Sequence, residues 1–467
     1  MPYVEVVVNS PGGRESTFVY AHDESLPLPV GSLVLVPFGT AEAQAIVMGI
    51  PDQLPEVPIR SILGPLDAQP VTTPEHVALA RWISEHYCCS LIDALAPMLP
   101  PGVSRRPQTF LSLVPDRPLP TEVTEGEYVV LEALRQARRV DLRSIRGALA
   151  RRSLARQTNR IVRGLVQRGL VEQDVAILRA AVNPRVEWYA RLAVSPAEAA
   201  ASLAELTRAP RQQALLGRLI QAPAAESVPL ALLREEGVGD LAVARSLVGR
   251  GLVALDQREV RRDPLAHRAF PHLPMPPLTQ HQSAALEEIE ATLGRRGYHP
   301  FLLYGITGSG KTEIYLRAIA ELLRQGKRAI VLVPEISLTP QTIQRFAGRF
   351  PGRLALLHSR LTAGERFDEW RRIRAGLADV VIGSRSAIFA PVPRLGGIFV
   401  DEEHEWSYKD ERTPRYHARE VALKLAELAG LTVVLGSATP AIESYQRAQR
   451  GELKLLTLPE RVEAASP

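Results

Sequence analysis

A complete phosphate-binding loop in the second half of the chain constrains the fold around it more than any other segment. The loop reads Gly305-Ile306-Thr307-Gly308-Ser309-Gly310-Lys311-Thr312. An apolar run at 300–304 precedes it and an amphipathic stretch at 313–323 follows it. This order predicts a buried strand, the loop and then a helix. A chance glycine-rich turn is the alternative, and it would not explain both flanks.

Each part of this loop has a chemical purpose. Glycines let backbone N–H groups surround the phosphates of a nucleotide, a lysine supplies a point charge, and a hydroxyl can hold Mg²⁺. The chain has 56 Lys+Arg but only five lysines, so the lysine at 311 indicates a need for a compact ammonium. We therefore predict that ATP and Mg²⁺ bind at Gly305, Thr307, Gly308, Ser309, Gly310, Lys311 and Thr312.

The pattern from about residue 276 onward predicts a doubly wound parallel α/β domain. Short apolar runs alternate with helical segments, and the runs lie at 301–304, 329–333, 380–382, 397–400 and 432–435. The run at 397–400 ends in Asp401-Glu402, where a strand end can hold Mg²⁺ through Asp401 and let Glu402 polarise a water. Ser437 and Thr439 follow another run and can sense the state of Glu402. A merely polar strand end is the alternative.

Composition excludes several classes of protein. The chain has 467 residues, which suggests about three domains, and 46% of them are hydrophobic. No run of 18 apolar residues and no signal peptide is present, so we expect a cytoplasmic protein. Its only cysteines, Cys88 and Cys89, are adjacent and cannot form a zinc site by themselves. The net charge of +5 permits a polyanionic partner.

The chain before the α/β region divides into three expected parts. Residues 1–105 carry short strand-like stretches, which predict a small β-rich barrel or sheet, followed by a helix from about Pro74 to His86. Residues 106–180 and 181–275 each end a helical stretch with a similar segment, at 165–171 and 247–253. These segments resemble the end of a winged helix; two unrelated helix ends with a glycine cap are the alternative.

The first of these two segments closes a strongly basic region. Eleven arginines and one acid, Asp141, fall between Arg135 and Arg168. Such density favours phosphate contacts, although a solvated arginine-rich face remains possible.

Together the phosphate loop, the acidic pair and the Ser-Ala-Thr segment resemble superfamily-two helicases of the DEAH/DExH type. Residues 278–282 resemble the segment that approaches adenine, which assigns Gln282 to the nucleotide. Residues 333–341 and 383–387 resemble loops that contact single-stranded DNA, which adds Arg385. The acidic box is followed by Trp406, Tyr408, Arg415, Tyr416 and Arg419, similar to the aromatic-rich loop of the PriA family of replication restart helicases. These residue types suit single-stranded DNA, because its bases stack on aromatic rings and its phosphates bind cations. Core packing of the rings is the alternative.

The first 105 residues resemble the domain of that family that captures a 3′ DNA end. Residues 17–20 and 36–39 are similar to its "TFxY" and "VPFG" elements. The resemblance assigns Phe18, Gly39 and Arg60 to the terminal base. Val19 stands where the family commonly has an acidic residue, which removes an acceptor for a base edge.

The resemblance implies a RecA-like first lobe over 276–467 and a DNA-bound, nucleoid-associated role at forks and D-loops. It also implies primosome and single-strand-binding proteins as partners. Family members continue into a second lobe with an arginine finger and a zinc domain, whereas this sequence ends fewer than thirty residues past Thr439. We therefore expect ATP binding with poor hydrolysis and no unwinding. The open alternatives are a fork-binding scaffold without motor activity and a small-molecule P-loop ATPase.

Overall fold

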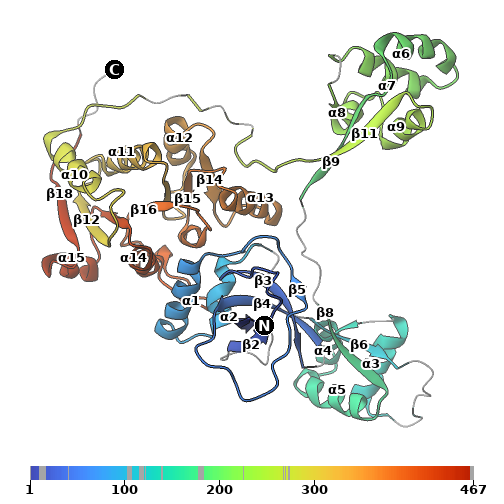
Figure 1. The fold of residues 1–467 in the computed structure, drawn as a ribbon, viewed down its shortest axis with the longest axis horizontal. Coiled ribbons are helices and arrows are strands. Elements are labelled where there is room, and N and C mark those ends of the chain that lie inside the picture. The colour runs from blue at the N-terminus through green and yellow to red at the C-terminus, as the bar shows by residue number, and fades with distance from the viewer. Residues whose placement is uncertain are drawn as a thin grey trace. The chain divides into compact units, whose positions relative to one another are not determined.

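The computed structural model describes the chain in several stretches. The described residues are 2–9, 17–39, 41–101, 108–114, 120, 123–137, 140–176, 184–223, 226–266, 268, 270–271 and 274–462. They form two compact units (Figure 1). The first comprises Met1–Ala181, Arg268–Leu361 and Glu369–Pro467, and the second comprises Val182–His267 and Thr362–Asp368.

The N-terminal part of the first unit is a five-stranded antiparallel sheet in the order β2-β1-β4-β3-β5. Its strands are β1 (Tyr3–Val8), β2 (Thr17–Ala21), β3 (Leu33–Phe38), β4 (Ala41–Gly49) and β5 (Gly64–Pro65). Alternating valines such as Val4, Val6 and Val8 are buried on one face, as a period of two requires. Helices α1 (Pro74–His86) and α2 (Leu91–Leu95) follow. The predicted β-rich start and the helix from Pro74 to His86 are therefore present.

A small module of helices and strands follows in the same unit. It consists of β6 (Gln108–Leu113), α3 (Glu125–Gln136), β7 (Val140–Asp141), α4 (Leu142–Ala150), α5 (Thr158–Gln167) and β8 (Val171–Ala176). Its antiparallel sheet has the order β7-β6-β8. Gly169 ends α5 with φ of 63°, a conformation that favours glycine, before the chain enters β8.

The second unit repeats this topology. It contains β9 (Val186–Leu192), α6 (Pro196–Leu203), α7 (Pro210–Ile220), β10 (Val228–Pro229), α8 (Leu230–Glu235), α9 (Leu241–Val248) and β11 (Val253–Glu259). Its sheet has the equivalent order β10-β9-β11. Gly251 closes α9 with φ of 72°, as Gly169 closes α5. The weak sequence repeat therefore reflects two similar modules rather than two unrelated helix ends.

The C-terminal part of the first unit is a seven-stranded parallel sheet in the order β14-β15-β13-β16-β17-β12-β18. Its strands are β12 (His299–Gly305), β13 (Arg328–Leu332), β14 (Leu354–Leu357), β15 (Val380–Gly383), β16 (Leu395–Val400), β17 (Thr432–Ser437) and β18 (Lys454–Leu458). The associated helices are α10 (Gln280–Glu290), α11 (Lys311–Arg324), α12 (Pro340–Arg349), α13 (Ala363–Arg374), α14 (Ala418–Ala429) and α15 (Ile442–Gln449). This is the predicted RecA-like α/β lobe, with β14 and β18 added to the five expected strands.

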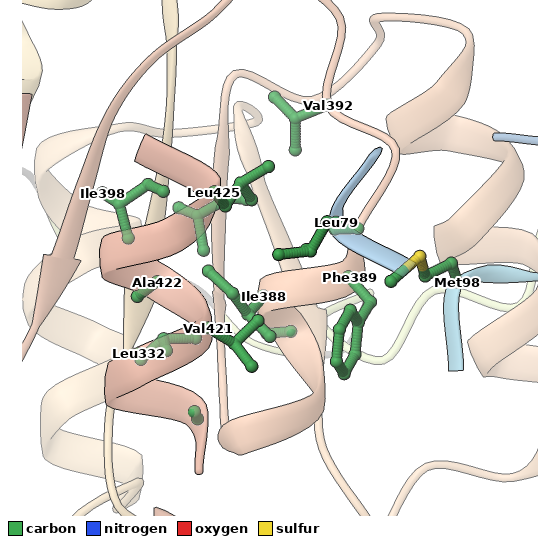
Figure 2. Close-up of a cluster of buried hydrophobic side chains, with 14 of the residues drawn as sticks. Leu79, Met98, Leu332, Ile388, Phe389, Val392, Ile398, Val421, Ala422 and Leu425 are labelled. Atoms are coloured by element: carbon green, nitrogen blue, oxygen red, sulfur yellow. The ribbon is translucent and has the colours of Figure 1, made fainter. Parts of the chain in front are cut away.

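The N-terminal sheet domain and the parallel lobe share one hydrophobic core (Figure 2). Leu79 of α1 and Met98, which follows α2, pack near Ile388, Phe389 and Val421 of the lobe. Helix α1 therefore lies against α14, and the C-terminal end of α1 reaches the loop between β16 and α14. Among the described residues, no helix has the length and apolar character needed to cross a bilayer.

Candidate nucleotide site and DNA-facing loop

The phosphate-binding loop connects β12 to α11, as its sequence predicts. Gly308 and Gly310 have φ of 83° and 81°, which lets the backbone turn so that N–H groups face one space. A Cβ on Gly310 would lie 2.3 Å from the side-chain nitrogen of Gln282, so a larger residue does not fit. The Ser309 hydroxyl is buried without a hydrogen-bond partner. These features fit a cradle for nucleotide phosphates.

Lys311 begins α11 and connects the loop to the acidic residues. Its ammonium donates a 2.8 Å hydrogen bond to the Gly305 carbonyl and lies 3.5 Å from a Glu402 carboxylate oxygen. A cavity of about 800 Å³ opens here, and its wall includes Thr312, Asp401 and Glu402 beside Lys311. The sheet thus brings together residues about ninety positions apart at its carboxyl edge.

Gln282 lies beneath the loop rather than in the cavity wall. Its amide nitrogen donates a 2.8 Å hydrogen bond to the Ser309 carbonyl, and its side-chain oxygen accepts from the Thr279 N–H. Because Gln282 is only 3% exposed, it supports the loop from behind. Its expected contact with adenine remains a prediction.

Asp401 follows β16 and is partly buried. The Tyr315 hydroxyl donates to its carboxylate at 3.4 Å. Burial and then the neighbouring Glu402 charge raise the pKa of Asp401 to about 6, while Lys311 acts in the opposite direction. A bound Mg²⁺ would favour the ionised carboxylate, so the donor set fits that ion. Glu402 is held at φ of 44°, which costs a residue with a side chain about 1–2 kcal/mol.

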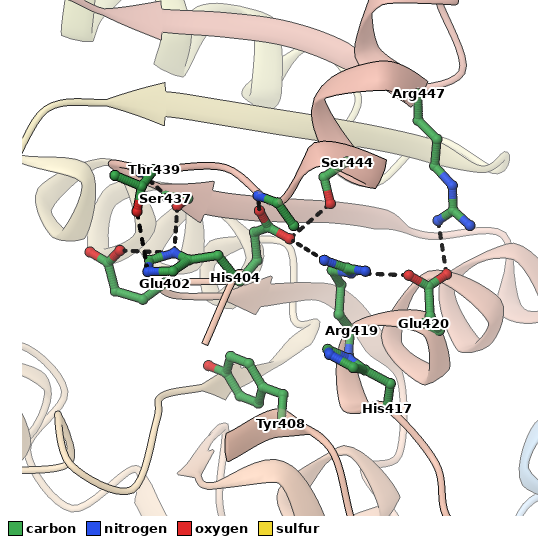
Figure 3. Close-up of polar contacts among 12 residues, drawn as sticks. Glu402, His404, Tyr408, His417, Arg419, Glu420, Ser437, Thr439, Ser444 and Arg447 are labelled. Carbon is green, nitrogen blue, oxygen red and sulfur yellow. Dashed lines mark hydrogen bonds and ion pairs between the residues drawn. The ribbon is translucent and has the colours of Figure 1, made fainter. Parts of the chain in front are cut away.

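His404 joins the acidic turn to the Ser-Ala-Thr segment, a role that the motif comparison did not assign (Figure 3). Its Nδ1 lies 2.7 Å from the Ser437 hydroxyl and its Nε2 lies 3.2 Å from the Thr439 hydroxyl. Glu402 is 3.6 Å from the same ring. A histidine two residues after the acidic pair, with hydroxyl residues at and just beyond the end of the next strand, was the available signal in the sequence.

Arg419 requires a correction. We expected it to contact DNA phosphates, but its guanidinium bonds to the Glu403 carboxylate at 2.9 Å and to Glu420 at 3.0 Å. Glu403 is fully buried and also accepts hydrogen bonds from the Ser444 hydroxyl and the Ala441 N–H. Arg419 is therefore part of a buried network that joins the acidic turn to α14 and α15 (Figure 3).

The expected stacking faces of Tyr408 and Tyr416 also require a correction, because both rings are buried, at 0% and 3% exposure. The Tyr416 ring packs edge-on against Phe389, with 5.0 Å between the ring centroids. Trp406 is 77% exposed and remains available as a stacking face. Core packing, the alternative from the sequence, is what the structure shows for the two tyrosines.

The two arginines of this region differ in their environments. Arg385 bonds to the backbone carbonyls of Ser407 and Lys409 at 3.2 and 3.3 Å, and its guanidinium pairs with Asp410 at 3.2 Å. It therefore supports the loop. Arg415 is exposed near the end of the same loop. Their expected DNA contacts remain predictions.

The three residues assigned to a 3′ end lie on β2 and in two loops of the N-terminal sheet domain. The Phe18 ring packs edge-on against Phe38, with centroids 5.1 Å apart. Arg60 donates a 3.1 Å hydrogen bond to the carbonyl of Gly39. Gly39 has φ of 64°, and a Cβ added there would meet no atom within 4 Å, so the space above it is open. Val19 lies between Phe18 and Tyr20 on β2.

Two family models match the chain. Residues 5–100 match the 3'DNA-binding domain (3'BD), and residues 279–448 match the DEAD/DEAH box helicase. These ranges coincide with the N-terminal sheet domain and with most of the parallel lobe. The N-terminal sheet domain is thus of the 3'DNA-binding domain class, and the parallel lobe is of the DEAD/DEAH box helicase class.

Curated relatives narrow this class. Replication restart protein PriA of Bacillus subtilis (strain 168) is 38% identical over 468 residues, which covers 99% of this chain and 56% of the relative. The Synechocystis protein of the same name is 34% identical over 483 residues, covering 99% and 55%. Over nearly its whole length the chain is thus similar to the PriA replication restart proteins. It spans about half the length of the curated relatives that it matches.

Solved structures superpose on only part of the chain. RecG bound to a three-way DNA junction matches with a TM-score of 0.32 and 26% identity, covering 42% of this chain and 25% of that chain. The Pyrococcus furiosus Hef helicase domain matches with a TM-score of 0.29 and 18% identity, covering 39% and 38%. These matches cover less than half of the chain, and the fold of the lobe is defined by its strand order alone.

Proposed function

We propose that this chain binds ATP with Mg²⁺ in its parallel lobe and 3′-ended DNA through its N-terminal domain, as a replication restart protein acting at stalled forks. One observation supports this most strongly. Lys311 and Glu402 lie 3.5 Å apart in a cavity that Asp401 and Thr312 also line. This is the set of groups that a nucleotide-hydrolysing helicase needs on its first lobe.

Each residue of the cavity has a distinct part in the proposed chemistry. The loop N–H groups and Lys311 hold the phosphates, while Thr312 and Asp401 hold the metal. Mg²⁺, when bound, neutralises charge on the outer phosphates. Glu402, held by Lys311 and His404, orients the attacking water. His404 passes the state of Glu402 to Ser437 through its 2.7 Å contact.

The proposed DNA contacts lie on two surfaces. Phe18, Gly39 and Arg60 hold the terminal nucleotide of a 3′ end, with the ring stacking on the base and the guanidinium near phosphate. Trp406 and Arg415 hold unpaired nucleotides beside the nucleotide cavity. The 77% exposure of Trp406 supports this second surface.

The names of the curated relatives motivate the remaining proposals. We place the protein in the cytoplasm with the chromosome, where it recruits primosome proteins and meets single-strand-binding protein. The relatives are described as replication restart proteins, which supports this setting.

Lys311→Ala tests the nucleotide part. Removing a buried charged donor to phosphate costs about 1.5–3 kcal/mol, so we expect ATP to bind about ten- to a hundredfold more weakly. DNA-stimulated ATP hydrolysis should fall with it, while fork binding persists. Lys327→Ala is the matched control, because Lys327 precedes β13 at the opposite edge of the sheet. Unchanged ATP binding in Lys311→Ala would overturn the proposal, and a scaffold would bind forks without any hydrolysis to lose.

A further inference from the structure

Helix α1 of the N-terminal domain ends directly on the loop that follows the acidic turn. Tyr87 caps α1, and its hydroxyl accepts a 3.2 Å hydrogen bond from the backbone N–H of His417. His417 is itself the N-cap of α14. The Lys409 ammonium lies 5.2 Å from the centroid of the Tyr87 ring, within the range of a cation–π contact.

The loop is held at its other end by the nucleotide site. The Tyr408 hydroxyl donates a 2.6 Å hydrogen bond to the backbone carbonyl of Asp401. Between the two ends, Lys409 and His417 form an antiparallel bridge, and the Asp410 N–H bonds to the Tyr416 carbonyl at 2.9 Å. The loop is therefore a closed hairpin with one anchor at Asp401 and one at Tyr87.

The same helix is connected to β2, the strand that carries Phe18 of the candidate 3′-end residues. Arg81 of α1 pairs with Glu5 of β1 at 2.6 Å. Glu5 lies opposite Val19 of β2, and the next pair along the ladder is Val6 with Phe18. Contacts thus run without a gap from β2 through β1 and α1 to the loop.

We infer that Tyr87 is a positioning residue that couples occupancy of the 3′-end surface to the nucleotide site. The inference rests on the proposed function. A 3′ end bound at Phe18 shifts the positions of β1 and α1, and Tyr87 transfers this shift to His417 and Lys409. Tyr408, one residue from Lys409, then sets the backbone of Asp401. Trp406 lies in the same hairpin, so its position for stacking responds to the same contact.

The test is a coupling measurement with the whole 467-residue chain. The affinity of a fluorescent ATP analogue is measured alone and with a saturating duplex that has a recessed 3′-hydroxyl end. The same duplex with a 3′-phosphate serves as the DNA control. We expect the 3′-hydroxyl duplex to change nucleotide affinity about fivefold or more, since coupling between sites is typically in this range.

Tyr87→Phe should reduce this coupling factor to about one, because it removes the acceptor for His417 and keeps the ring. Its separate affinities for the nucleotide and for the duplex should stay at the wild-type values, as should its melting temperature. Tyr298→Phe is the matched control, since it removes the hydroxyl of another partly exposed tyrosine on the lobe, and it should keep the coupling. Lys409→Gln removes the cation on the Tyr87 ring and should lower the coupling in the same direction.

The outcomes separate this inference from the proposed function. Wild-type coupling in Tyr87→Phe would overturn the inference, and so would a wild-type protein that binds both ligands without coupling. If Tyr87→Phe instead bound both ligands more weakly and melted at a lower temperature, Tyr87 would have a packing role only. That result would also overturn the inference. A wild-type chain that binds neither ligand would overturn the proposed function itself.

Discussion

The hydroxyl of Tyr408 donates a 2.6 Å hydrogen bond to the backbone carbonyl of Asp401, although the ring itself is completely buried. The family resemblance predicts that Tyr408 stacks on DNA, but its side chain instead makes its hydrogen bond in the protein interior. It holds the backbone of the residue that is expected to bind the metal. Burial raises the pKa of Tyr408 well above its ordinary value, so the hydroxyl remains a donor at every ordinary pH.

Tyr408→Phe should destabilise the chain and weaken Mg-ATP binding. The change leaves a buried carbonyl without its donor, which costs about 1–2 kcal/mol in the free energy of unfolding. Urea denaturation measures this cost, and titration with a fluorescent ATP analogue measures the affinity. Tyr445→Phe, at a side chain that is 42% exposed, is the control and should change neither quantity. Equal stability of Tyr408→Phe and wild type would show that the hydrogen bond contributes nothing.

Trp406→Ala should weaken binding of single-stranded DNA without loss of stability. Stacking of a base on an aromatic ring contributes about 1–3 kcal/mol, so we expect roughly a five- to 150-fold increase in Kd. Fluorescence anisotropy with a labelled oligonucleotide measures the affinity. Leu377→Ala is the control, because this exposed residue precedes β15 at the amino edge of the sheet, opposite the site. An unchanged Kd would remove Trp406 from the DNA surface.

The parts of the site that follow from local sequence were predictable. The strand, loop and helix around Lys311 depend on short-range pattern and on glycine conformations, and both are visible in a single sequence. β14 was not predicted, although its four apolar residues form a run as long as others that were predicted. The acidic turn at the end of β16 was predictable because a polar pair follows a buried run.

The roles of the residues after the acidic turn were not predictable in the same way. Tyr416 and Arg419 look like DNA contacts when only spacing is considered. The Tyr416 ring packs against Phe389 and Arg419 pairs with the buried Glu403, so tertiary contacts within the lobe determine their burial. No local pattern contains those contacts. The same applies to Glu403, whose charge is buried because α14 and α15 supply its partners.

Arg419→Met should mainly lower stability, whereas Arg415→Met should mainly weaken DNA binding. Loss of Arg419 leaves the Glu403 carboxylate buried without its ion-pair partner, which costs about 3–5 kcal/mol of stability. Loss of the exposed Arg415 should change stability by less than about 0.5 kcal/mol. It should instead lower single-strand affinity and reduce the salt dependence by roughly 0.7 in the log–log slope. Thermal unfolding and salt titrations measure the two effects. A stable Arg419→Met variant with weakened DNA binding would restore Arg419 as a DNA contact.

Acidification should destabilise the core shared by α1 and the parallel lobe, which lowers the free energy of unfolding. His76 of α1 is buried, and burial lowers its pKa from the ordinary 6.5 to about 4. Between these two values the unfolded chain binds a proton that the folded chain does not, so stability is complete above about pH 6.5 and falls toward pH 4. The contribution of His76 over this window is on the order of 3 kcal/mol. Burial, and next Arg419, also lower the pKa of His417 to about 4, which acts in the same direction. Urea denaturation at several pH values should therefore give a shallower pH dependence for His76→Leu than for wild type. Parallel curves for the two proteins would show that His76 protonates as readily in the folded state as in the unfolded state.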